Sequence, residues 1–169
     1  FYQLDLPSAP RVTGVSSGEE ALEILARRHF DMVIITLSIH DLSPFDLGKR
    51  IKERDASLPV FLLLTDNNDV SLLREEDVRS GGVDRIFVWN GDPKVLLAMI
   101  KYVEDIRNVE NDTRIAQVPV ILIVEDSVIY YSKFLPIVYI AVIKQTGRLI
   151  REEQVDADKK ILKMRIRPK

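Results

Sequence analysis

The chain has 169 residues, enough for one well-buried domain or for one domain and part of another. Its net charge of −2 provides no basic field for nucleic acid or anionic lipid, and the absence of cysteine excludes disulfides and thiolate chemistry. The N-terminal residues lack a signal-peptide pattern, and apolar stretches such as residues 135–143 are too short to span a bilayer. We therefore expect a cytoplasmic protein that does not enter the membrane.

Short apolar runs alternate with amphipathic segments over the first two thirds of the chain. The runs, at residues 11–15, 31–36, 59–64 and 84–88, are rich in β-branched residues, and the last three are almost continuously apolar, as in strands buried on both faces. The segments between them have helical spacing, with helix starts at Ser17, Pro44 and Asp92-Pro93 and a weaker helix around residues 72–78. This alternation predicts an α/β fold in which helices cover both faces of a parallel sheet.

The last third of the chain begins with a polar stretch and continues with the most apolar run. Residues 109–118 are interpreted as a linker, and residues 119–124 (PVILIV) as the strongest strand candidate in the chain. Glu125, Asp126 and Ser127 follow at once, and a long helix is predicted from Ser127 to about Arg165.

Several of these segments resemble a response-regulator receiver domain, also called a CheY-like domain. Residues 16–22 and 30–35 resemble a receiver's second helix and third strand, residues 64–66 and 82–88 resemble the end of its fourth strand and its fifth strand, and residues 120–127 resemble its first strand with an acidic pair. The chain is also similar to tandem receivers of multidomain bacterial sensor proteins that carry a phosphoenolpyruvate synthase-like module. The resemblance implies a flavodoxin-like, doubly wound parallel sheet, here with a long C-terminal helix.

The resemblance also implies where phosphoryl-transfer residues would stand. It places the Mg²⁺-binding acidic pair at Glu125 and Asp126, the hydroxyl at Thr65, the phosphoacceptor at Thr36 and the lysine at Trp89. Threonine cannot replace a carboxylate in acyl-phosphate chemistry, and tryptophan cannot form an ion pair with a phosphoryl oxygen. We therefore expect a degenerate receiver that is not an enzyme, with Mg²⁺ as the one cofactor implied. The alternative interpretation, which we favour, is that Glu125 and Asp126 stand at the start of a helix capped by Asp126 or Ser127.

The order of the segments differs from that of a complete receiver. Residues 1–108 correspond to a receiver without its first strand and helix, and residues 119–169 to the first strand and extended first helix of a receiver. Two arrangements are open: the chain is part of a tandem array, or the late strand fills the vacant position in the sheet, within one chain or by exchange between two. We expect the second arrangement, because an open apolar edge is costly.

The function expected from these features is signalling through protein contacts in a two-component phosphorelay pathway. The partners would be other domains of the same signalling protein or a separate protein, and a homodimer through the long helix is expected. One alternative is a tandem receiver whose second module, with Glu125 and Asp126, is phospho-competent when complete. Another is DNA binding by the basic C-terminal helix, although nucleic acid is not the expected partner because that helix lacks interleaved aromatic residues. His29 and His40 have no metal-ligand spacing and are expected at the surface.

Overall fold

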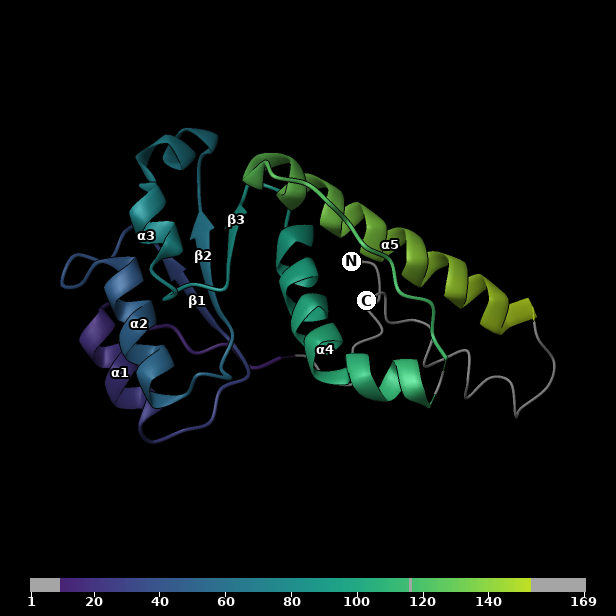
Figure 1. Ribbon diagram of the computed structural model, residues 1–169, viewed down its shortest axis with the longest axis horizontal. Helices are drawn as coiled ribbons and strands as arrows, with labels where there is room; N and C mark the ends of the chain where they lie inside the picture. The colour runs from purple at the N-terminus through teal and green to yellow at the C-terminus, as the bar shows by residue number, and fades with distance from the viewer. Residues whose placement is uncertain (1–9, 116, 153–169) are drawn as a thin grey trace.

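A computed structural model describes residues 10–115 and 117–152, with side chains to residue 148. Its described elements are α1 (Gly18–Leu25), β1 (Val33–Thr36), α2 (Pro44–Arg54), β2 (Val60–Leu64), the 3₁₀ helix η1 (Asn67–Leu72), α3 (Glu75–Arg79), β3 (Arg85–Val88), α4 (Lys94–Arg114) and α5 (Val128–Glu152). The strands form a parallel sheet in the order β1-β2-β3. Helices α1 to α3 lie on one side of the sheet and α4 and α5 on the other (Figure 1). The predicted α/β class is confirmed.

Strand β2 is buried on both faces, which explains its unbroken apolar sequence. Leu62 and Leu64 pack in the same cluster as Phe45 of α2, whereas Phe61 and Leu63 pack against α4 and α5. All five residues of β2 are buried. A central strand of a parallel sheet covered by helices on both sides requires this composition.

Serine residues cap the first two helices: Ser17, as predicted, and Ser43, which precedes the predicted start at Pro44. The Ser17 hydroxyl accepts a hydrogen bond from the Glu20 backbone N–H at 3.2 Å, and the Ser43 hydroxyl accepts one from Asp46 N–H at 3.1 Å. Each bond satisfies a backbone donor that has no partner within the first helical turn.

Helix α4 is longer than expected, because residues 109–114 of the predicted linker are helical. The polar side chains of this segment bond within the helix: Thr113 Oγ1 donates to Val109 O, and Arg114 forms an ion pair with Glu110 at 3.0 Å. Arg107, earlier in the same helix, donates to the backbone oxygen of Asp31 and pairs with its carboxylate just before β1. The helix follows β3 in the chain, and its Arg107 holds it against the residues just before β1.

Two predicted strands are not formed. Residues 11–15 and residues 119–124 are in no strand, and Val12 is 91% exposed. A strand exists only when a neighbour supplies its backbone hydrogen bonds, and in the described part of the chain β1 pairs with β2 alone. Residues 119–124 therefore do not occupy the vacant position beside β1 of their own chain in this structure, and their exchange between two chains stays a prediction. Residues 11–15 likewise pair with no strand among the described residues.

Helix α5 is attached to the far edge of the sheet. The Ser132 hydroxyl accepts a hydrogen bond from Val88 N–H of β3 at 2.9 Å and donates one to Val128 O at 2.7 Å. Leu135 and Tyr139 of α5 join the core that covers β2 and β3. The part of the predicted long helix after Glu152 lies outside the described residues. Among the described helices none is long and apolar enough to cross a membrane.

Replacing Ser132 by alanine should weaken the attachment of α5. The substitution leaves the buried Val88 N–H without its acceptor, which we expect to cost roughly 1–3 kcal/mol of unfolding free energy. Hydrogen exchange measures the effect locally: the Val88 amide should lose protection in Ser132→Ala. The Trp89 amide, bonded to Leu64 O at 2.8 Å, is the internal control and should keep its protection. Unchanged exchange at Val88 would contradict the assigned bond.

Candidate functional site

Three of the predicted site residues lie at the carboxyl edge of the sheet, where its three parallel strands end. Thr36, the last residue of β1, pairs with Leu63, and Leu64 pairs with Val88 of β3. Thr65 and Trp89 follow those two paired residues directly. Because the strands are parallel, Thr36, Thr65 and Trp89 mark the carboxyl ends of β1, β2 and β3, where ligand sites of α/β sheets form.

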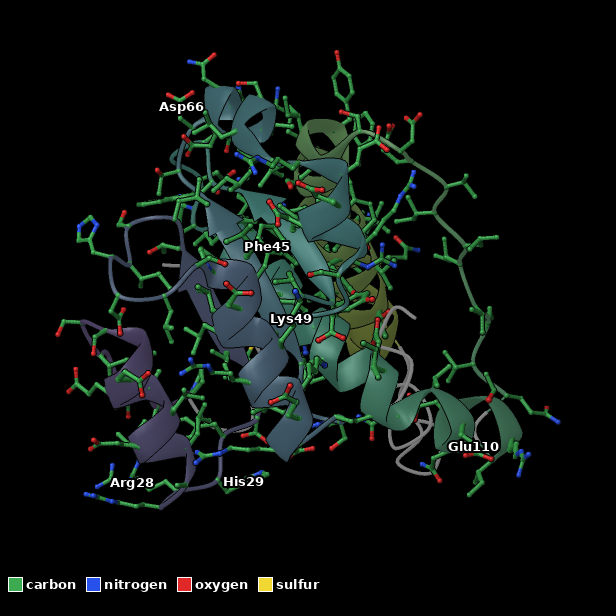
Figure 2. All side chains as sticks on the ribbon, turned by 60° about the vertical axis from the view of Figure 1, so that its left-hand side comes forward. Arg28, His29, Phe45, Lys49, Asp66 and Glu110 are labelled. Atoms are coloured by element: carbon green, nitrogen blue, oxygen red, sulfur yellow. The ribbon has the colours of Figure 1, made fainter. Side chains whose placement is uncertain are left out.

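The Thr65 side is organised around a carboxylate. Asp69 Oδ2 accepts hydrogen bonds from Thr65 N–H at 3.1 Å, from the Thr65 hydroxyl at 3.4 Å and from Asp66 N–H at 3.0 Å. Asp66 caps the start of η1 and is labelled at the top of Figure 2. The Thr65 hydroxyl thus bonds within its own loop, an arrangement that orders the loop at the sheet edge.

Trp89 presents an exposed aromatic surface at the same edge. Its side chain occupies the position that the resemblance assigns to lysine, and the residue is 41% exposed. Thr36 is partly buried and ends β1, which β2 separates from β3. A half-exposed indole is typical of protein contact surfaces and provides no positive charge for a phosphoryl group.

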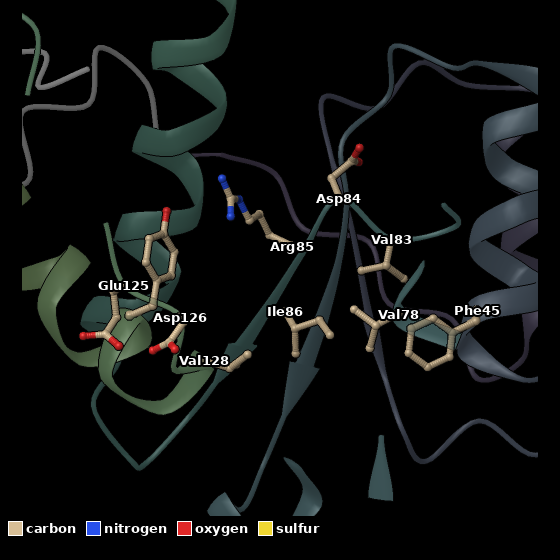
Figure 3. Close-up of a pocket in the computed structure, with 10 residues that line it drawn as sticks. Phe45, Val78, Val83, Asp84, Arg85, Ile86, Glu125, Asp126 and Val128 are labelled. Carbon is tan, nitrogen blue, oxygen red and sulfur yellow. The ribbon is translucent and has the colours of Figure 1, made fainter. Parts of the chain in front are cut away.

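Glu125 and Asp126 lie elsewhere, beside β3. They line a pocket of about 240 Å³ together with Asp84, Arg85 and Ile86 (Figure 3). Its other lining residues come from α2, α3, the turn before β3 and the first turns of α5: Phe45, Val78, Val83, Val128 and Tyr131. Thr36, Thr65 and Trp89 do not line this pocket. The acidic pair therefore does not share this pocket with the other three predicted site residues.

The acidic pair lies just before α5, and one of its two carboxylates bonds to the backbone there. Glu125 Oε1 accepts a hydrogen bond from Ser127 N–H at 2.9 Å, so this carboxylate caps the start of α5. Among the described residues, no group of three or more histidine, aspartate or glutamate side chains gathers closely enough to hold a metal ion. One or two carboxylates suffice for Mg²⁺ when waters and substrate phosphates complete its coordination, so the Mg²⁺ site at Glu125 and Asp126 stays a prediction.

The sequence analysis did not identify a buried polar cluster between α4 and α5. The Tyr139 hydroxyl donates a hydrogen bond to Asp105 Oδ2 at 2.9 Å, and Asp105 Oδ1 is buried with no hydrogen-bond partner. Burial raises the pKa of Asp105 to about 7, although the Tyr139 hydrogen bond opposes the shift. Burial and the neighbouring Asp105 carboxylate also raise the pKa of Tyr139 well above its usual range.

Other charged side chains of α4 surround Asp105. Lys101 is buried and pairs with Glu104 at 2.8 Å, and Asp112 is buried about two helical turns after Asp105. The negative charges of Glu104 and Asp112 raise the pKa of Asp105, and the positive charge of Lys101 lowers it. The sequence carries a signal for this cluster, because Ala98, Lys101, Asp105 and Asp112 continue the buried face of the helix at three-, four- and seven-residue spacing.

A second cluster that was not predicted borders the pocket. Arg85 donates from Nε to the Tyr102 hydroxyl at 3.0 Å, and its guanidinium lies 5.5 Å from the Tyr102 ring and 5.4 Å from the Tyr131 ring. Asp84, at the same end of β3, forms an ion pair with Lys52 at 2.6 Å and accepts from Val60 N–H at 2.7 Å. These contacts join β3 to α2, α4 and α5.

The two histidines lie at the surface, as expected. His29 lies at the end of the α1 region beside Arg28 (Figure 2), and His40 is also exposed. His29 approaches the exposed Asp31 at 3.6 Å. Both side chains are exposed, and among the described residues they belong to no group of three histidine, aspartate or glutamate side chains that could hold a metal ion.

No protein-family model and no curated protein matches this chain. Among solved structures, it is similar to a two-component response regulator from Clostridium difficile, with 21% identity over 54% of this chain and 73% of that one and a TM-score of 0.45. It is also similar to NtrX from Brucella abortus, solved in complex with ATP, with 14% identity over 79% of this chain and 27% of that one and a TM-score of 0.47. At these TM-scores, the similarities do not decide the function.

Proposed function

We propose that this chain is a receiver-like signalling module that works through protein contacts and does not accept a phosphoryl group. The observation that carries the proposal is Thr36 at the carboxyl end of β1, where the resemblance places a nucleophilic aspartate. A threonine hydroxyl forms no acyl phosphate, so the usual phosphoacceptor is missing at this position.

Two features of the same edge support the proposal. The exposed Trp89 stands where a receiver would carry lysine, so there is no cation at this position to pair with a phosphoryl oxygen. Glu125 and Asp126 line the pocket beside β3, away from Thr36 in the strand order. The acceptor and the cation are therefore each replaced, and the acidic pair lines a pocket that Thr36, Thr65 and Trp89 do not line. The carboxyl edge of the sheet, marked by Thr36, Thr65 and Trp89, is the proposed contact surface. We propose no catalysis by the chain itself.

The intact mass of the chain after incubation with Mg²⁺ and a small phosphodonor tests the proposal. We expect no phosphoryl adduct and no change in association with the phosphodonor or with beryllofluoride. The variant Thr36→Asp is the matched comparison, because it restores a carboxylate at the one position without changing the rest of the edge. An acyl-phosphate adduct on the unmodified chain would contradict the proposal, and its position would identify the carboxylate that accepts it.

A further inference from the structure

Strand β1 offers an open edge. It lies at one end of the order β1-β2-β3, and within the described residues its backbone pairs with β2 only. Its sequence is apolar and β-branched, and Ile34 is 37% exposed. Parallel strands of this composition are normally interior strands with neighbours on both sides, and an open edge is a template for another strand.

The chain also contains a strand-like segment that pairs with no strand in the part of the chain that the structure describes. Residues 119–124 include Val120, Leu122 and Val124, which are 57%, 85% and 87% exposed. In both Figure 1 and Figure 2 this segment, which leads from the end of α4 to the start of α5, runs outside the sheet. Contiguous exposed apolar side chains of this kind mark an interaction site.

We propose that residues 119–124 of one copy of this chain add as a strand to the outer edge of β1 in a second copy, and that the exchange is reciprocal. The open edge and the unpaired segment are complementary, because each supplies the backbone partners that the other lacks. A reciprocal exchange closes a dimer with two equivalent contacts and leaves no free segment. The inference goes beyond the proposed function and does not rest on it.

The attachment of α5 favours pairing of residues 119–124 with β1 of a second copy over pairing with β1 of the same chain. Ser132 bonds to Val88, so the start of α5 lies at β3, the edge opposite β1. With strands about 4.8 Å apart, the position beside β1 lies about 14 Å from β3. The four steps from residue 124 to residue 128 span at most about 14 Å when fully extended. Residues 119–124 could reach β1 of their own chain only if residues 124–128 were fully extended in a straight line. Pairing with β1 of a second copy does not require this, and α5 keeps its contacts with β3.

The absence of cysteine from the chain allows a direct test. Ile34→Cys and Leu122→Cys are prepared as separate chains, refolded together and oxidised. We expect a disulfide-linked dimer that contains one chain of each kind, formed in preference to dimers of either kind alone. The double variant Ile34→Cys/Leu122→Cys distinguishes the alternative: an intrachain disulfide in a monomer would show that the segment pairs with its own sheet and would overturn the proposal.

The oligomeric state of the full chain provides the second measurement. Light scattering should show a dimer, and Leu122→Pro, which removes a backbone donor from the proposed strand, should raise the dimer dissociation constant at least about tenfold. Val12→Pro is the matched control in an exposed segment outside the sheet and should leave the dimer unchanged. A monomeric unmodified chain, or a dimer that Leu122→Pro does not weaken, would overturn the proposal.

Discussion

The unfolding free energy of this protein should fall as the pH rises from about 4 to about 7. The carboxyl of Asp105 has a pKa of about 7 in the folded chain, against an ordinary value of 3.8. Between these two values the folded state holds a proton on Asp105 that the unfolded state has released, so raising the pH favours unfolding. Below this window Asp105 is protonated in both states, and above it Asp105 is ionised in both, so its contribution to the pH dependence ends.

The size of the effect follows from the difference between the two pKa values. At about 1.4 kcal/mol per pH unit, a shift from 3.8 to about 7 corresponds to about 4 kcal/mol. Asp105 is only 5% exposed, so solvent screening reduces this figure little. The expected loss is a large part of the stability of a typical domain.

The variant Asp105→Asn isolates this contribution. Asparagine retains an oxygen that accepts the Tyr139 hydrogen bond and cannot ionise, so most of the slope between pH 4 and pH 7 should disappear. Urea unfolding at several pH values measures the slope, and the variant should be more stable than the unmodified chain at pH 8. Glu53→Gln removes one exposed carboxylate and serves as the control, with the original slope retained. An unchanged slope in Asp105→Asn would assign the pH dependence to other groups.

Replacing Gly48 by alanine should destabilise the fold by about 3 kcal/mol, although alanine is the better helix former. Gly48 lies inside α2, and a Cβ atom there would lie 2.1 Å from the backbone oxygen of Gly82. The contact is reciprocal, since a Cβ on Gly82 would lie 2.4 Å from the backbone oxygen of Phe45. Both obstacles are backbone atoms, so no side-chain rotation relieves them, and α2 must move away from the turn before β3.

Thermal and urea unfolding of Gly48→Ala measure this loss. Gly14→Ala is the matched control, because nothing lies within 4 Å of a Cβ built at Gly14. We expect the control to stay within about 0.5 kcal/mol of the unmodified chain, as surface substitutions usually do. If Gly48→Ala is as stable as Gly14→Ala, the close approach of α2 to Gly82 is not a feature of the folded protein.

The sequence was most informative where burial and local pattern agree. The runs that form β1, β2 and β3 are almost continuously apolar because helices cover both faces of the sheet. These strands could therefore be predicted from their residues alone. Residues 119–124 have the same pattern, yet they form no strand here, because pairing depends on a neighbour that local composition does not specify. Pattern alone thus identifies a strand-forming segment and leaves its partner undetermined.

The candidate site was predictable only in part for a similar reason. The common edge of Thr36, Thr65 and Trp89 follows from parallel strand order, which the strand–helix alternation predicts. The position of Glu125 and Asp126 depends instead on where α5 attaches, and that is set by Ser132 and the core contacts of α5. The pairing of Asp105 with Tyr139 joins residues 34 positions apart, and a polar residue on a helix gives no local sign of a partner on another element.

Trp89 is the only tryptophan in the chain, and it stands at the edge proposed for partner contacts. The protein therefore carries a single indole fluorophore, and the wavelength of its emission depends on the exposure to water of the carboxyl edge of the sheet. A partner that covers the edge should shift this emission to shorter wavelength and shield it from soluble quenchers. A partner that binds at the open side of β1 should leave it almost unchanged, so one spectrum of the unlabelled protein distinguishes the two surfaces.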